Sequence, residues 1–297
     1  MNAALELGLL YGIMALGVYL TFRVLNFPDL TVDGSFTTGA AVAASLIVQG
    51  VPAPVATLAG AASGAVAGIV TGVLYTKGRI DGLLAGILTM IALWSINLRI
   101  MGKSNLPLLR EDTVMTPLRD NGLLGGPWSI LIFAIFALVL KFAIDWFLST
   151  DLGLSIQATG NNEQMIRSFG VNTHFTTILT LAISNALVAL CGALVAQYQG
   201  FADVSMGIGL ILVGLASVII GQAIIAGRSV WVATLAVLVG AIVYRLVIFL
   251  ALAAGLNPND MKLISAVLVV AALLLPRWGF LKRVPSFRQL NRRAVRA

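Results

Sequence analysis

Long apolar stretches recur along the whole chain. Two of them, residues 130–140 and 210–220, contain no charged side chain at all. Because a helix needs about 20 apolar residues to cross the hydrocarbon core of a bilayer, stretches of this length predict transmembrane helices. The nine predicted spans cover residues 4–22, 34–50, 53–74, 82–99, 128–148, 174–197, 206–225, 229–253 and 261–276. The sequence therefore predicts an all-α fold, a polytopic transmembrane helical bundle of about nine spans.

Two polar connections between the predicted spans are too long to be simple turns. The first, residues 102–127, mixes Arg110, Glu111 and Arg119, and the second, residues 149–172, contains a short polar helical pattern. They follow consecutive spans, so they lie on opposite sides of the membrane. We predict that both are docking surfaces for other proteins.

The Lys and Arg residues predict which side each connection faces, since cytoplasmic loops carry an excess of them. The chain has 19, and seven of these lie in residues 277–297. Placing that tail in the cytoplasm puts twelve inside and five outside, and leaves Lys141 and Arg245 within spans. We therefore predict a membrane domain of residues 1–276, with residues 102–127 outside, and a basic cytoplasmic tail of residues 277–297 that attracts anionic membrane lipid.

A short sequence pattern occurs twice, once before the second predicted span and once before the seventh. Phe27–Gly34 and Phe201–Gly207 share the order Phe, small residue, Asp, aliphatic, hydroxyl, apolar, Gly, with Asp33 as one extra residue. An odd number of spans separates them, so they would lie in opposite orientations, as inverted-topology repeats do. Matching helix interruptions of this kind point to a substrate pathway. The alternative is that Asp29 and Asp203 only cap helix starts.

Ionisable residues in or near membrane spans are costly and are therefore candidates for function. We predict that the translocation pathway passes Asn26, Asp29, Asp33, Asp203 and Arg245. Lys141 and Asp145 are four residues apart, a spacing that favours a paired structural role.

The composition excludes most other classes of protein. Hydrophobic residues make up 59% of the chain and charged residues 10%, against roughly 25% charged in soluble domains. The basic balance reflects the tail, so no nucleic-acid partner is predicted. Gly102-Lys103-Ser104 lacks the earlier Gly of a phosphate loop, and one His with one Cys cannot form a zinc site. We expect neither an enzyme nor a cofactor.

Several motifs resemble one family of bacterial membrane proteins. They are residues 12–17 followed by Leu25-Asn26-Phe27, residues 29–35, residues 153–162 leading into 163–171 with Arg167, Gly170 and Val171, residues 183–187, and residues 215–221. The chain is similar to permease subunits of ABC importers in the branched-chain amino-acid and ribose permease superfamily. In its short form it resembles a branch with aromatic amino-acid importers among its members.

The resemblance implies a role and a set of partners. The chain would be a permease without an ATP site of its own, in the bacterial inner membrane, with its C-terminus in the cytoplasm. It would work with cytoplasmic ABC ATPase subunits, an extracytoplasmic solute-binding protein and a second permease copy, identical or related. Its solute would be small, an amino acid or alternatively a sugar or nucleoside. A secondary, ion-coupled transporter is the alternative reading, because it would also show interrupted helices and intramembrane acids.

Residues 158–172 resemble the cytoplasmic coupling segment of that family. We predict a short helix that ends at Gly170 in a left-handed cap. The predicted ATPase-coupling residues are Glu163, Gln164, Met165, Ile166, Arg167, Ser168, Phe169 and Gly170. In a helix the polar members share one face and the apolar members another. Such a rod fits a groove on a partner, or alternatively lies on lipid headgroups.

Overall fold

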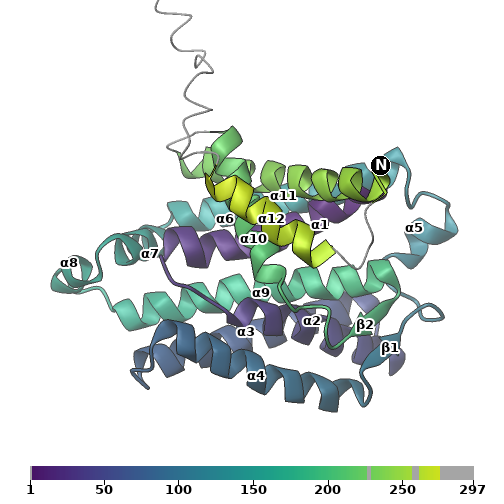
Figure 1. The fold of residues 1–297 in the computed structure, drawn as a ribbon. Helices are drawn as coiled ribbons and strands as arrows, with labels where there is room; N and C mark the ends of the chain where they lie inside the picture. Colours follow the sequence, from purple (N-terminus) through teal and green to yellow (C-terminus); the bar gives the residue numbers. More distant parts are fainter. Residues whose placement is uncertain (1, 226–228, 256–260, 275–297) are drawn as a thin grey trace, which may run out of the picture.

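The computed structural model describes residues 2–225, 229–255 and 261–274, which are almost wholly helical (Figure 1). In chain order its elements are α1 (Asn2–Tyr19), the π-helical turn η1 (Leu20–Val24), α2 (Thr31–Val48), α3 (Ala53–Thr76), α4 (Gly82–Met101), β1 (Asn105–Pro107), α5 (Thr116–Asp120), α6 (Pro127–Ser149), α7 (Asp151–Asn161), α8 (Glu163–Ser168), α9 (Thr173–Gln199), β2 (Phe201–Asp203), α10 (Leu210–Ile224), α11 (Val230–Ala253) and α12 (Met261–Leu274). The predicted all-α, polytopic bundle is confirmed.

Each of the nine predicted spans corresponds to an apolar helix. Seven have the length and hydropathy of a membrane span, namely α1 with η1, α2, α3, α4, α6, α9 and α11. The seventh predicted span starts later than expected, because α10 begins at Leu210 and has 15 residues. At 1.5 Å per residue such a helix is too short to cross a core of about 30 Å. The end of the last predicted span and the basic tail 277–297 lie outside the described residues.

Helices α1, α2 and α9 form the centre of the bundle. Figure 1 shows α9 across the middle of the molecule, with α3 and α4 on one side and α11 on the other. In the most apolar window of each span, 83% of α1 with η1, 72% of α2 and 67% of α9 are buried, against 28% of α4 and of α6. The three central helices therefore pack against protein, while α4 and α6 present apolar side chains suited to lipid.

Glycines bring α2, α3 and α9 into backbone contact. A Cβ atom at Gly39 of α2 would overlap the carbonyl of Ala189 in α9, and one at Gly64 of α3 would overlap the carbonyl of Asn185. Small residues of this kind allow close helix packing where no hydrophobic effect drives helices together. The glycines therefore allow these three helices to form one closely packed group.

The polar connections gather at opposite ends of the bundle (Figure 1). At one end, here called the strand end, β1 pairs antiparallel with β2 and places Leu106 opposite Ala202. The side-chain amide of Asn2 donates to the Gly125 carbonyl at 2.7 Å, which brings the N-terminus to the same end. At the other end, here called the α8 end, lie α7 and α8. The two long polar connections, residues 102–127 and 149–172, therefore lie at opposite ends of α6, as predicted. Which of these ends faces the cytoplasm stays a prediction.

Candidate functional site

The first predicted helix interruption lies between η1 and α2. Asn26 has a φ of 57°, in the left-handed region that few residues other than glycine adopt. The Oδ1 atom of Asp29 then accepts a hydrogen bond from the Thr31 N–H at 2.9 Å, and α2 begins at Thr31. Asp29 therefore caps the start of α2, as its position in the sequence predicts.

The second interruption, between α9 and α10, repeats this local geometry. Gly200 has a φ of 81°, and a Phe follows it, as one follows Asn26. The Oδ1 atom of Asp203 accepts a hydrogen bond from the Ser205 N–H at 2.8 Å. The repeated sequence pattern therefore corresponds to a repeated backbone turn, and the inverted orientation of the two turns stays a prediction.

Asp203 does not cap α10, and that prediction is wrong because the second break is the longer one. Helix α10 begins seven residues beyond Asp203, at Leu210. Asp203 lies instead at the strand end, where its Oδ2 accepts a bond from the Asn105 side chain at 3.2 Å. Burial acts to raise the pKa of the Asp203 carboxyl, but hydrogen bonds from Ser205 and Asn105 outweigh it and hold the pKa below its ordinary value.

The residue that caps α10 is Asp33, in the first turn of α2. Its Oδ2 accepts a hydrogen bond from the Gly209 N–H at 2.7 Å, and its Oδ1 accepts one from the Ile211 N–H at 2.8 Å. A Cβ at Gly207 would overlap the carbonyl of Asp33, so the backbone of the second break packs directly against the backbone of α2. The starts of the two helices that follow the breaks are thus tied to each other by one carboxylate.

The first break lies in the interior of the bundle. Asp29 is fully buried, and its Oδ2 accepts a bond at 2.7 Å from the side chain of Asn185, near the middle of α9. The Thr31 hydroxyl bonds Thr71 of α3 at 2.8 Å, and Thr71 in turn bonds Thr89 of α4 at 3.0 Å. Non-helical backbone at membrane depth must be covered by protein or water, and here surrounding helices cover it.

Arg245, the remaining pathway candidate, lies on α11. Its guanidinium carbon is 4.0 Å from the centre of the Tyr11 ring of α1. The arrangement is a cation–π contact. The structure therefore brings together Asn26, Asp29 and Asp33 around the start of α2, but places Asp203 at the strand end and Arg245 between α1 and α11.

The sequence prediction left out one buried acid, Glu6 of α1. Its carboxylate accepts hydrogen bonds from the Gly125 N–H at 2.8 Å, from the Tyr198 hydroxyl at 2.6 Å and from the Ser129 hydroxyl. These bonds join α1, α6 and α9 near the strand end. Glu6 falls inside the first predicted span, so the rule that intramembrane acids matter applies to it as well.

Lys141 and Asp145 of α6 form the predicted structural pair. The Lys141 Nζ is 2.6 Å from Asp145 Oδ2, and both side chains are buried. The Thr234 hydroxyl of α11 donates to the other oxygen of Asp145 at 2.7 Å, and Lys141 lies 4.8 Å from the centre of the Trp231 ring. The pair therefore fastens α6 to α11.

The predicted coupling segment forms two helices and not one. Helix α7 ends at Asn161, and Asn162 leaves helical geometry with a φ of −159° while its side chain accepts a bond from the Met165 N–H at 3.0 Å. An asparagine that caps a new helix in this way interrupts the old one. The predicted left-handed residue is confirmed, since Gly170 has a φ of 85°.

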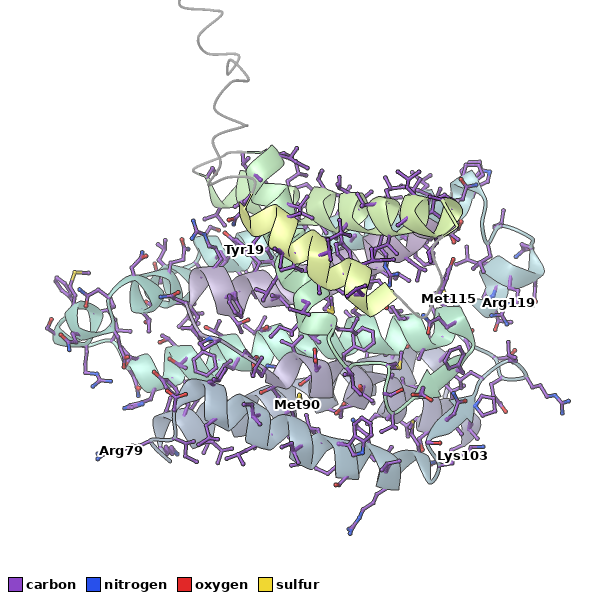
Figure 2. All side chains as sticks on the ribbon, in the orientation of Figure 1. Tyr19, Arg79, Met90, Lys103, Met115 and Arg119 are labelled. Atoms are coloured by element: carbon purple, nitrogen blue, oxygen red, sulfur yellow. The ribbon has the colours of Figure 1, made fainter. Side chains whose placement is uncertain are left out.

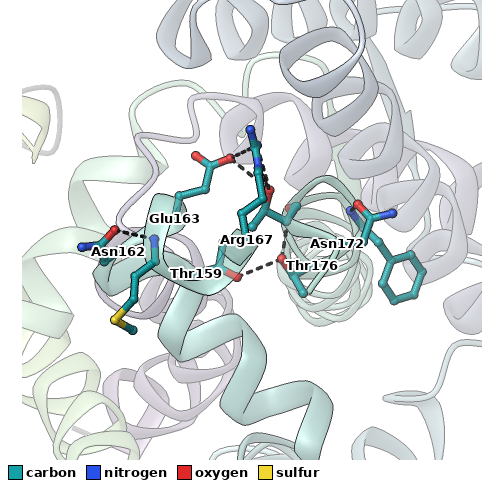
Figure 3. A network of polar contacts seen from close by, with 9 residues as sticks. Thr159, Asn162, Glu163, Arg167, Asn172 and Thr176 are labelled. Atoms are coloured by element: carbon teal, nitrogen blue, oxygen red, sulfur yellow. Dashed lines mark hydrogen bonds and ion pairs between the residues drawn. The ribbon is translucent and has the colours of Figure 1, made fainter. Parts of the chain in front are cut away.

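A polar network holds α8 against the start of α9 (Figure 3). Arg167 pairs with Glu163 at 2.6 Å and also donates to the Thr173 hydroxyl at 2.9 Å, while that hydroxyl donates to Glu163 at 3.1 Å. These three side chains bond to one another on one face of α8. The opposite face carries exposed apolar side chains. Met165 of α8 is 47% exposed, and Phe169, the residue directly after α8, is 76% exposed.

An open pocket of about 690 Å³ adjoins this network at the α8 end. The residues lining it include Lys77, Arg79, Asp81, Glu163, Arg167 and His174. Figure 2 shows Arg79 at this end, opposite Lys103 at the strand end. The α8 end therefore presents apolar and charged groups side by side.

A bundle of apolar helices with interruptions between them is an architecture found in membrane transport proteins. The chain belongs to the family described as branched-chain amino acid transport system / permease component, which matches residues 1–274. The resemblance inferred from its motifs is thereby confirmed, and the protein is a multi-pass membrane permease subunit of the ABC type.

Three relatives illustrate the range of this family. The tyrosine transport system permease protein of Clostridioides difficile is 44% identical, over 89% of this chain and 87% of the relative. The galactofuranose transporter permease protein of Escherichia coli is 25% identical, over 89% of this chain and 76% of the relative. The ribose import permease protein of Haemophilus influenzae is 25% identical, over 70% of this chain and 61% of the relative. No solved structure matches the chain.

Proposed function

We propose that the chain is the membrane-spanning subunit of a binding-protein-dependent importer, and that it moves an amino acid inward while a separate subunit hydrolyses ATP. An aromatic amino acid is the favoured solute. The support for this choice is the 44% identity, over most of both chains, to a relative named as a tyrosine transport permease. The relatives named for sugars are only 25% identical.

The observation that carries the proposal is the exposed apolar face of α8. Met165 and Phe169 are large side chains that the rest of the described chain leaves uncovered, next to a polar network that holds the helix in place. A helix of this kind suits a groove on a partner protein. In the proposal the partner is the ATPase, and Glu163 to Gly170 transmit its closure to the membrane helices.

The other end of the molecule serves the binding protein in this proposal. Residues 102–127 contribute β1 and α5 at the strand end (Figure 1), and the pairing of β1 with β2 connects them to the second helix break. A loaded binding protein seated there would contact the segment that leads to α10. A second permease copy completes the path, which runs beside Asn26, Asp29, Asp33, Asp203 and Arg245.

ATP-driven uptake into proteoliposomes tests the proposal directly. The complete complex should accumulate labelled tyrosine only with ATP and its binding protein, and an ionophore that removes ion gradients should leave uptake unchanged. A secondary transporter would give the reverse result, with uptake that follows the gradient and ignores ATP.

Variants of α8 test the coupling role. Phe169→Ala should lower ATPase stimulation by the loaded binding protein at least fivefold, since it removes the most exposed apolar group of the segment. Trp146→Ala is the matched control, because Trp146 of α6 is 69% exposed and lies outside α8. Equal stimulation of wild type and Phe169→Ala would exclude α8 as the coupling helix.

A further inference from the structure

Arg245 carries a positive charge inside the bundle without an acidic partner among the described residues. The ion pairs of the described chain are Lys141 with Asp145 and Glu163 with Arg167. The Nε atom of Arg245 is buried and has no hydrogen-bond partner there. Since α11 ends at Ala253, Arg245 lies about 12 Å from the strand end of its helix. A charge at such a depth is costly and marks a functional position.

The neighbours of Arg245 orient its guanidinium but do not neutralise it. The Tyr11 ring lies under the guanidinium at 4.0 Å, and Tyr11 in turn stacks on Phe36 of α2 with ring centres 6.0 Å apart. Gly8 of α1 faces the base of the side chain, where a Cβ atom would come within 3.5 Å of the Arg245 Cβ. Arg245 as a whole residue is partly exposed.

We propose that Arg245 binds the carboxylate of the transported solute. A guanidinium offers paired N–H donors whose spacing matches the two oxygens of a carboxylate, and such a pair would supply both the missing charge and a partner for Nε. Tyr11 is the positioning residue that holds the guanidinium plane. The inference rests on the proposed function and deepens it: the permease itself selects for solutes with a carboxylate, in addition to any selection by the binding protein.

Direct binding to the permease tests this without the binding protein. The purified permease with its ATPase subunit, in lipid nanodiscs, is titrated with tyrosine and with tyramine, which lacks the carboxylate. Wild type should bind tyrosine at least tenfold more tightly than tyramine. Arg245→Gln should lose that tenfold preference, and Arg245→Lys should retain part of it because it keeps the charge but not the planar donor pair.

Arg99→Gln is the matched control, since Arg99 is an exposed arginine in the last turn of α4 and its loss changes the net charge equally. It should bind both probes as wild type does. Equal affinities of wild type for the two probes, an unchanged preference in Arg245→Gln, or no binding of tyrosine by wild type would each overturn the proposal. The proposed function is judged separately, because ATP-driven uptake by wild type can succeed even where the preference is absent.

Discussion

Replacing Asp33 by Ala removes both hydrogen bonds that hold the first turn of α10. The Gly209 and Ile211 N–H groups donate to this carboxylate at 2.7 and 2.8 Å, and each is a bond to a charged acceptor. Bonds of that type contribute about 1.5–3 kcal/mol each. We therefore expect Asp33→Ala to lower the free energy of unfolding by about 3 kcal/mol, taking the lower value twice. Asp33→Asn, which keeps one acceptor oxygen, should lose about half of that.

The measurement is equilibrium unfolding in mixed micelles of lipid-like detergent and dodecyl sulfate, followed by circular dichroism. Asp81→Ala is the control, because Asp81 caps α4 through the Leu83 N–H at 3.0 Å but lies exposed at the α8 end. An exposed cap is worth about 1 kcal/mol or less. If both alanine variants lower the free energy of unfolding equally, Asp33 is an ordinary cap and the link between α2 and α10 is not as described.

Three further predictions concern other parts of the molecule. Lys141→Met should cost about 3–5 kcal/mol of unfolding free energy because it leaves the buried Asp145 carboxylate without its partner, and adding Asp145→Leu should recover most of the loss in the same unfolding assay. Since the folded pKa of Asp203 lies below its ordinary value, its contribution to stability is present above about pH 4 and is lost as the pH falls through the folded pKa. The protection of strand-end amides, which is their exchange rate relative to the intrinsic rate at the same pH, should therefore fall on acidification in wild type and not in Asp203→Asn. Gly39→Leu should prevent the packing of α2 against α9, because the leucine side chain has no space against Ala189. The measurement is loss of the folded protein on size-exclusion chromatography.

The helices and both interruptions could be predicted because they follow from local properties of the chain. The length of each apolar stretch predicts a span. The Asp two residues before Thr31, and the one two residues before Ser205, predict the turns. What could not be predicted depends on contacts between distant segments. The role of Asp33 requires the end of the second break to lie beside the start of α2, and no local signal places it there.

The coupling segment shows the same limit on a smaller scale. The periodicity of residues 158–172 predicted an amphipathic helix and identified its apolar side correctly. The interruption at Asn162 was missed because an asparagine can occupy a helix interior or cap a new helix, and the choice depends on its surroundings. Likewise, the small sheet of β1 and β2 joins segments nearly a hundred residues apart. The pattern within a strand of three residues is too short to predict such a pairing.

The backbone contacts among α2, α3 and α9 constrain how the protein can move. Gly39 and Gly64 leave no gap against α9, and Gly240 and Gly221 bring α10 and α11 into the same kind of contact, with Ser217 and Ala236 as their neighbours. Helices in such contact cannot slide without a steric clash, so we expect each group to travel as a rigid body. Helix α1 packs against both groups, through Gly17 on α9 and Gly12 on α11, and Asp33 adds a polar link from α2 to the start of α10. A motion of one group relative to the other would therefore have to break the two hydrogen bonds of Asp33 as well as shift the contacts of α1, and its rate would depend in part on how readily those bonds break and re-form.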